Sequence, residues 1–244
     1  MIGSNRYRYY LPEQSLELTR IIFASKAKVP LKDIASSLSV TDPSKSMTLY
    51  NQISQNLSMH IRELEAVQDT IRNMKYYYSL TLSHELNQPF TLYLPEWFLI
   101  HSQRLKISAR YEATESNIAN HLFMKGFRDG LWPHYQLGAF FSEEEFLQDQ
   151  FSETSYFLKT DHPEAYSKED LLFIPNGRWV CVILNVQGQN LPDAMKQYKQ
   201  TLYSHNLNIH GHVFVMDIIN SMLTTDVNQY RTMIFSLEGS KHHE

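Results

Sequence analysis

The feature that most constrains this chain is a long heptad repeat in its first third. Apolar side chains recur at spacings of three and four with no proline or glycine among them, which is typical of a coiled-coil helix. A lone helix with one narrow apolar stripe is unstable and needs a partner. We therefore expect residues 45–81 to form a dimerisation helix that joins a homodimer through residues 45–79. The alternative is a bundle helix that packs on its own domain. The stripe consists of Tyr50, Ile53, Leu57, His60, Leu64, Val67, Ile71, Met74 and Tyr78.

His60 is the polar member of this stripe. A histidine there can set the register of the two helices or respond to pH. The simpler interpretation is a partly exposed residue at the edge of the helix contact.

Two shorter helical patterns precede the long helix. Residues 15–26 and 31–38 each carry apolar side chains at helical spacing, and Val29-Pro30 separates them. They predict a small helical hairpin. Asp42-Pro43-Ser44 marks the start of the long helix, because proline suits the first helical turn.

After residue 82 the pattern changes to short apolar runs separated by turns. Both halves of this region have the order strand, helix, strand, strand, which predicts an internal duplication of residues 88–160 and 168–238. We expect an α+β fold with one C-terminal domain over residues 82–240. The expected strands cover residues 94–101, 136–141, 156–158, 170–174, 179–186, 213–219 and 230–237, and the expected helices cover residues 113–130 and 192–206.

Charge and cysteine content narrow the class of protein. The formal net charge is −4, so any contact with DNA must be local. Residues 1–35 hold six basic and three acidic side chains, which is a local charge of +3. The single cysteine, Cys181, excludes an intrachain disulfide and fits a reducing, cytoplasmic setting, where it is a buried strand residue. We find no signal peptide and no apolar run long enough to span a membrane. The 15 tyrosines indicate either ordinary packing or an aromatic-lined pocket.

Motifs for catalysis and metal binding are incomplete. His84-Glu85 begins like a zinc-protease helix, but Gln88 stands where the second histidine belongs. His210-Gly-His212 has no third ligand nearby in the sequence. The acidic run at residues 143–145 is interpreted as a solvated loop or a helix start. We therefore expect no enzyme activity, no metal and no cofactor.

Three features in one order resemble a known family. Tyr7-Arg8-Tyr9-Tyr10 precedes the helical hairpin, the heptad helix follows, and the duplicated domain contains Ile174-Pro-Asn-Gly-Arg-Trp and His212-Val-Phe-Val-Met-Asp. This order is similar to bacterial MerR-family transcription regulators that carry a GyrI-like, multidrug-type effector-binding domain. The resemblance covers nearly the whole chain, and it implies promoter DNA and a lipophilic small molecule as partners.

The resemblance assigns residues 1–44 to a partial winged-helix, DNA-binding region. In that family the Tyr-Arg-Tyr-Tyr segment belongs to the wing, which implies phosphate contacts by Arg6, Arg8, Tyr9 and Tyr10. Family members carry a helix-turn-helix before the wing, and that unit enters the major groove. Here Met1 stands where that unit would end. The expectation is that the helix-turn-helix is missing, or that the protein no longer binds DNA as its relatives do.

The resemblance also predicts effector-binding residues. The family commonly places a glutamate on the penultimate strand, in an aromatic pocket that receives cations. Val215 holds that position here, and Asp217, two residues on and thus on the same strand face, is the candidate substitute. Asp217 can equally be a hydrogen-bonded strand-end residue. Tyr230 matches a pocket tyrosine, and aliphatic pocket positions make a neutral ligand as plausible as a cation. The remaining predicted effector residues are Leu137, Phe141 and Leu191.

The leading hypothesis is a homodimeric regulator of the MerR type that senses a lipophilic small molecule in its C-terminal domain. The second is a binding module for a small molecule or a protein partner that keeps only a remnant of the wing. The third is a hydrolytic enzyme, which would need an acid as base in the pocket, and Val215 at that position counts against it.

Overall fold

The computed structural model describes residues 11–38, 42–106, 137–185, 191–220 and 223–239. The predicted DNA contacts, Arg6, Arg8, Tyr9 and Tyr10, lie outside these residues, as does the helix expected at residues 113–130. The chain divides into two compact units, Met1–Glu65 and Ala66–Glu244. The division of the chain into 1–44, 45–81 and 82–240 stays a prediction.

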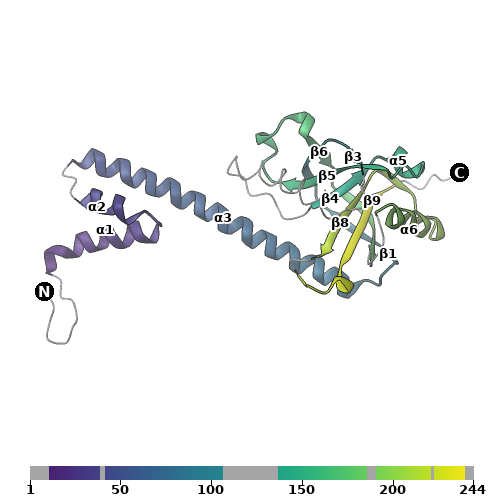
Figure 1. The fold of residues 1–244 in the computed structure, drawn as a ribbon, viewed down its shortest axis with the longest axis horizontal. Helices are drawn as coiled ribbons and strands as arrows, with labels where there is room; N and C mark the ends of the chain where they lie inside the picture. Colours follow the sequence, from purple (N-terminus) through teal and green to yellow (C-terminus); the bar gives the residue numbers. More distant parts are fainter. Residues whose placement is uncertain (1–10, 39–41, 107–136, 186–190, 221–222, 240–244) are drawn as a thin grey trace. The chain divides into compact units, whose positions relative to one another are not determined.

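The first unit is helical. A short 3-10 turn, Pro12–Gln14, leads into α1 (Ser15–Lys26), α2 (Leu31–Leu38) and the first part of α3 (Pro43–Ser83) (Figure 1). The predicted helical hairpin is confirmed. Its small core consists of Ala24, Ala27, Val29, Ile34 and Ile53.

The long helix begins where the sequence predicts. The backbone N–H of Ser44 donates to Oδ1 of Asp42 at 2.9 Å, and the Ser44 hydroxyl donates to the same oxygen at 2.8 Å. The first bond satisfies a backbone donor of the first helical turn, and Pro43 has no backbone N–H that would need an acceptor. The helix then runs unbroken for 41 residues.

The second unit contains a nine-stranded antiparallel sheet among its described residues. The strand order is β1-β7-β9-β8-β4-β5-β2-β6, with β3 paired to β5. The predicted α+β fold class is thereby confirmed. The strands are β1 (Pro89–Leu94), β2 (Trp97–His101), β3 (Leu105–Lys106), β4 (Leu137–Phe141), β5 (Glu153–Thr160), β6 (Leu171–Ile174), β7 (Gly177–Leu184), β8 (Ile209–Ile219) and β9 (Arg231–Glu238).

The first strand of each sequence half pairs with a strand of the other half. β1 comes from the first half but pairs with β7 of the second, whereas β6 comes from the second half and pairs with β2 of the first. At the centre β4 pairs with β8. The turn at Pro95-Glu96 separates β1 from β2, where the sequence predicted one strand over residues 94–101.

Two helices belong to one side of this sheet. α6 (Leu191–Ser204) buries Met195, Tyr198 and Leu202 in a core that also contains Phe146 of α5 (Glu143–Leu147). The acidic run is the start of α5. The Ser142 N–H donates to the Glu145 carboxylate at 2.8 Å, and the Glu145 N–H donates to the Ser142 hydroxyl at 3.3 Å, a reciprocal cap.

Candidate functional site

Six neighbouring strands each contribute one large aromatic side chain to the same face of the sheet. The rings form a connected network, with the Phe214 and Phe235 rings stacked at 5.4 Å between centroids. The Trp179 ring lies 5.8 Å from the Phe214 ring and 5.7 Å from the Phe235 ring. We call this cluster the aromatic face, and it consists of Trp97 (β2), Phe140 (β4), Phe157 (β5), Trp179 (β7), Phe214 (β8) and Phe235 (β9).

Strand alternation in the sequence builds this face. In β7 the residues Trp179, Cys181 and Ile183 share the aromatic face, while the residues between them point to the α6 side. Successive side chains of a strand point to opposite faces, so a run that is apolar throughout is buried on both sides. Cys181 is fully buried, as predicted. Its burial raises the pKa of the thiol well above the usual range, so the thiol is not a nucleophile at neutral pH.

The indole of Trp179 is the exceptional group on the aromatic face. Trp179 is 2 % exposed, and its Nε1 has no hydrogen-bond partner among the described residues. A buried N–H without an acceptor costs roughly 1–3 kcal/mol. An acceptor atom placed beside this nitrogen would recover that energy.

The end of α3 belongs to the same cluster. Tyr77 and Leu80 are each 6 % exposed and are part of the buried core that contains the aromatic face. The site is thus built partly from the last turns of α3, which belong to the second unit.

Two histidines flank the aromatic face at Phe140. The His101 ring centroid lies 5.8 Å from that of Phe140, and the His212 centroid lies 5.4 Å from it. Loss of water at this half-buried site lowers the pKa of His212, and the nearby His101 adds to the effect, whereas the carboxylates of Glu145 and Glu143 oppose it. His212 is therefore held in its neutral form and can donate or accept one hydrogen bond.

Most of the predicted effector residues lie elsewhere. Phe141, Leu191 and Val215 are buried in the core between the sheet and α6, on the face opposite Trp179. The structure places Leu137 at the start of β4 and does not describe its side chain. Their role in effector binding stays a prediction. The alternation on β4 and β8, with Phe140 and Phe214 facing the other way, was the sequence signal for the aromatic face.

Asp217 lies near the end of β8. It shares the strand face of Val215, as predicted, and its Oδ1 accepts a hydrogen bond from Oγ1 of buried Thr232 at 2.6 Å. Loss of water around the carboxylate raises the pKa of Asp217, and the Thr232 hydrogen bond opposes this rise. The residue keeps exposed surface, which limits the rise. Tyr230, which is half-buried, directly precedes β9.

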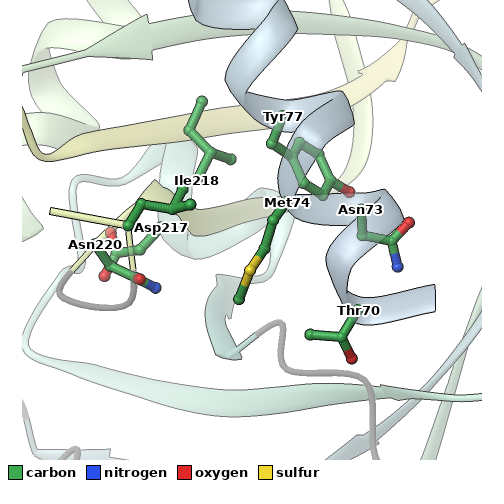
Figure 2. Close-up of a pocket in the computed structure, with 8 residues that line it drawn as sticks. Thr70, Asn73, Met74, Tyr77, Asp217, Ile218 and Asn220 are labelled. Carbon is green, nitrogen blue, oxygen red and sulfur yellow. The ribbon is translucent and has the colours of Figure 1, made fainter. Parts of the chain in front are cut away.

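A small crevice lies beside Asp217. Figure 2 shows side chains of α3 on one side and residues at and after the end of β8 on the other. Its volume of about 20 Å³ accommodates a water molecule but not a drug-sized ligand. It is lined by Thr70, Asn73, Met74, Tyr77, Asp217, Ile218, Asn220 and Leu223.

The heptad stripe of α3 is largely exposed. Leu64 is 69 % exposed and Ile71 is 53 % exposed, and Leu57, Val67 and Tyr78 are also exposed. The helix therefore has two apolar faces near its C-terminal end. Its own unit covers the face with Tyr77 and Leu80. Of the heptad stripe, the described residues bury Ile53 in the first unit and partly bury Met74 at the crevice. They leave Leu57, Leu64, Val67, Ile71 and Tyr78 exposed.

The other histidine motifs do not converge. His210 lies 3.5 Å from the Glu143 carboxylate, whereas His212 faces Phe140, because Gly211 between them has a positive φ of 76°. The His84 ring packs on Phe90. In the described part of the chain, no three metal-ligating side chains come together. No helix there is both long and apolar enough for a membrane span.

Comparisons with known proteins give remote structural likenesses. No family model and no curated protein matches this sequence. A structure of EcmrR bound to DNA is 14 % identical, with a TM-score of 0.44 over 98 % of this chain and 89 % of that one. SAV2435 bound to tetraphenylphosphonium is 12 % identical, with a TM-score of 0.41 over 64 % and 98 %. A hydrolase from Listeria innocua is 9 % identical, with a TM-score of 0.39 over 66 % and 97 %. At these scores no function is transferred from those proteins.

Proposed function

We propose that this protein is a homodimeric regulator of the MerR type that responds to a lipophilic small molecule at the aromatic face. The observation that carries the ligand response is the shared cluster of Tyr77 and Leu80 with Trp179. A molecule that binds beside Trp179 would alter the packing of the last turns of α3, because Tyr77 and Leu80 belong to the same cluster. These turns belong to the helix that carries the heptad stripe, so ligand binding would act on the proposed dimer helix.

The chemistry of the face indicates the ligand class. Its aromatic rings favour a molecule with flat apolar groups, and the N–H of Trp179 favours one with a hydrogen-bond acceptor. The described side chains of the aromatic face supply no carboxylate to hold a cation. We therefore assign a neutral aromatic ligand with a carbonyl or similar acceptor.

The exposed heptad stripe supports the homodimer. Leu57, Leu64, Ile71 and Tyr78 recur at intervals of seven and lie on the solvent side of α3. Apolar rows with this period bury themselves against another helix with the same repeat, and a second copy of this chain supplies one. DNA contact in this proposal rests on the basic, tyrosine-containing segment at Arg6–Tyr10.

The ligand proposal is tested with benzophenone, which is neutral and carries a carbonyl, and diphenylmethane, which lacks it. Benzophenone should bind the wild type about three- to tenfold more tightly. Trp179→Phe should abolish this difference, whereas the matched control Trp97→Phe should keep it. Hydrogen exchange over residues 66–83 should slow when benzophenone binds. Equal affinities for the two probes in the wild type would contradict the assignment of Trp179.

A mobility-shift experiment with duplex DNA separates the regulator from the DNA-independent binding module. The regulator predicts that the dimer binds DNA and that Arg6→Ala with Arg8→Ala weakens this binding with a smaller salt dependence. Failure of the wild type to bind DNA, together with intact benzophenone binding, would favour the binding module.

A further inference from the structure

A second, larger cavity lies on the α6 side of the sheet. It has a volume of about 620 Å³, within the range of small-molecule sites. Phe146 and Leu202, both buried, contribute to its floor and belong to the core opposite the aromatic face. We call it the α5–α6 groove. Its other lining residues are Glu143, Leu147, Lys199, Tyr203, Leu207, Asn208, Ile209, His210, Leu237, Glu238 and Gly239.

Two of the charged groups in the groove already have charged partners. The Lys199 ammonium donates to the Asp149 carboxylate and to the Leu147 carbonyl, each at 2.8 Å. The Glu238 carboxylate lies 3.0 Å from Nε of Arg178. In each pair the two opposite charges neutralise one another, so we do not expect Lys199 or Glu238 to bind a charged ligand.

Glu143 differs from both. Its Oε2 accepts the backbone N–H of Gly211 at 2.6 Å and lies 3.5 Å from Nδ1 of His210. The Gly211 bond fixes the orientation of the carboxylate at the groove wall. A carboxylate held in this way can accept hydrogen bonds from a ligand ammonium group on its remaining lone pairs.

The buried aromatic ring of the groove is already engaged by a cation. Nζ of Lys199 lies 5.8 Å from the centroid of the Phe146 ring. A quaternary ammonium cannot donate hydrogen bonds and binds through aromatic rings, and the Phe146 ring already has the Lys199 ammonium over it. A primary ammonium can use Glu143 instead, while its alkyl chain lies on the accessible apolar side chains of the groove, which are Leu147, Leu207 and Ile209.

We propose that the α5–α6 groove is a second ligand site that binds a primary ammonium group carried on an apolar chain, with Glu143 as its anchor. This site is separate from the aromatic face because the sheet lies between them. It is independent of the benzophenone proposal, and either can fail without the other.

The test measures binding of three probes of equal chain length to the full-length protein by calorimetry: octylamine, octyltrimethylammonium and 1-octanol. Octylamine should bind about fivefold more tightly than the other two, a modest factor because Glu143 is partly exposed. Glu143→Gln should reduce octylamine to the affinity of octanol. The matched control is Glu144→Gln, an exposed neighbour on α5 that does not line the groove.

A second variant locates the site. Asn208 is exposed and lines the groove, so Asn208→Trp should fill the groove without disturbing the core, and should weaken binding of both octylamine and octanol. The proposal is overturned if octyltrimethylammonium binds as tightly as octylamine, if Glu143→Gln behaves like Glu144→Gln, or if Asn208→Trp leaves octylamine binding unchanged.

Discussion

Gly138 and Phe157 are register partners on β4 and β5, and the Phe157 ring lies directly against the Cα of Gly138. A Cβ at residue 138 would lie 2.2 Å from Cζ of Phe157 and 2.5 Å from the Val215 carbonyl oxygen. The aromatic face therefore depends on a residue with no side chain at this position.

This contact predicts that Gly138→Ala destabilises the protein. Overpacking of this kind costs about 1–3 kcal/mol, because neither the ring nor the β8 backbone can move freely. Urea unfolding of the variant measures the loss. Adding Phe157→Leu should recover part of it, because the smaller side chain relieves one of the two clashes. Strict additivity of the two substitutions would contradict the contact.

Stability should fall at alkaline pH because of two buried groups. Burial raises the pKa of Tyr198, whose hydroxyl donates to the Val180 carbonyl, and also that of Cys181. The unfolded chain releases these protons near pH 10 and 8.5, whereas the native protein keeps them. The contribution of each group to the free energy of unfolding is therefore fully present below its unfolded pKa. Above that value it falls by up to about 1.4 kcal/mol for each unit by which the pH rises.

Urea unfolding between pH 8 and 11 checks this dependence. Tyr198→Phe lowers stability at pH 7 by about 1 kcal/mol, because buried Ser236 loses its partner at 2.6 Å. Above pH 10, however, its stability should decline less steeply than that of the wild type. Cys181→Ala should flatten the curve from about pH 8.5. Parallel curves for all three proteins would show that these groups do not control the transition.

Acid should weaken the fold through His212. Its pKa is lowered in the native state, so the unfolded chain takes up the proton first as the pH falls below about 6.5. The stability contribution is present above this pH and is lost below it. His212→Phe keeps the ring contacts with Phe140 and Phe214 and removes the titration. The variant should lose less stability than the wild type between pH 7 and 5. An equal loss would assign the acid sensitivity to other groups.

Local sequence signals predicted most helices and strands. Asp42-Pro43-Ser44 begins α3, and Pro175-Asn176 separates β6 from β7. These boundaries are set by capping and by the fixed φ of proline, which are local effects. The pairing of β1 with β7 was not predictable in the same way, because it joins residues that are far apart in the sequence.

The aromatic face was not predicted from the sequence, for a related reason. The alternation on β8 separates Val213 and Val215 from Phe214 and Met216, and this separation is visible in the sequence. Which set faces α6 depends on tertiary packing, because a continuous apolar run has no solvent side. Val215, which the sequence analysis chose as a pocket residue, therefore lies on the face of the sheet opposite Trp179.

The measurement that tests the central claim most directly is the mass of the wild-type protein in solution by sedimentation equilibrium. The exposed stripe on α3 predicts a species of twice the chain mass. Leu64→Lys should shift it to a single chain, because a charge at a residue that is 69 % exposed in one copy becomes buried in the dimer.

The control is Gln55→Lys, on the side of α3 away from the stripe, which should remain dimeric. A wild-type protein with the mass of one chain, or a Leu64→Lys variant that dimerises as tightly as the wild type, would contradict the proposed homodimer.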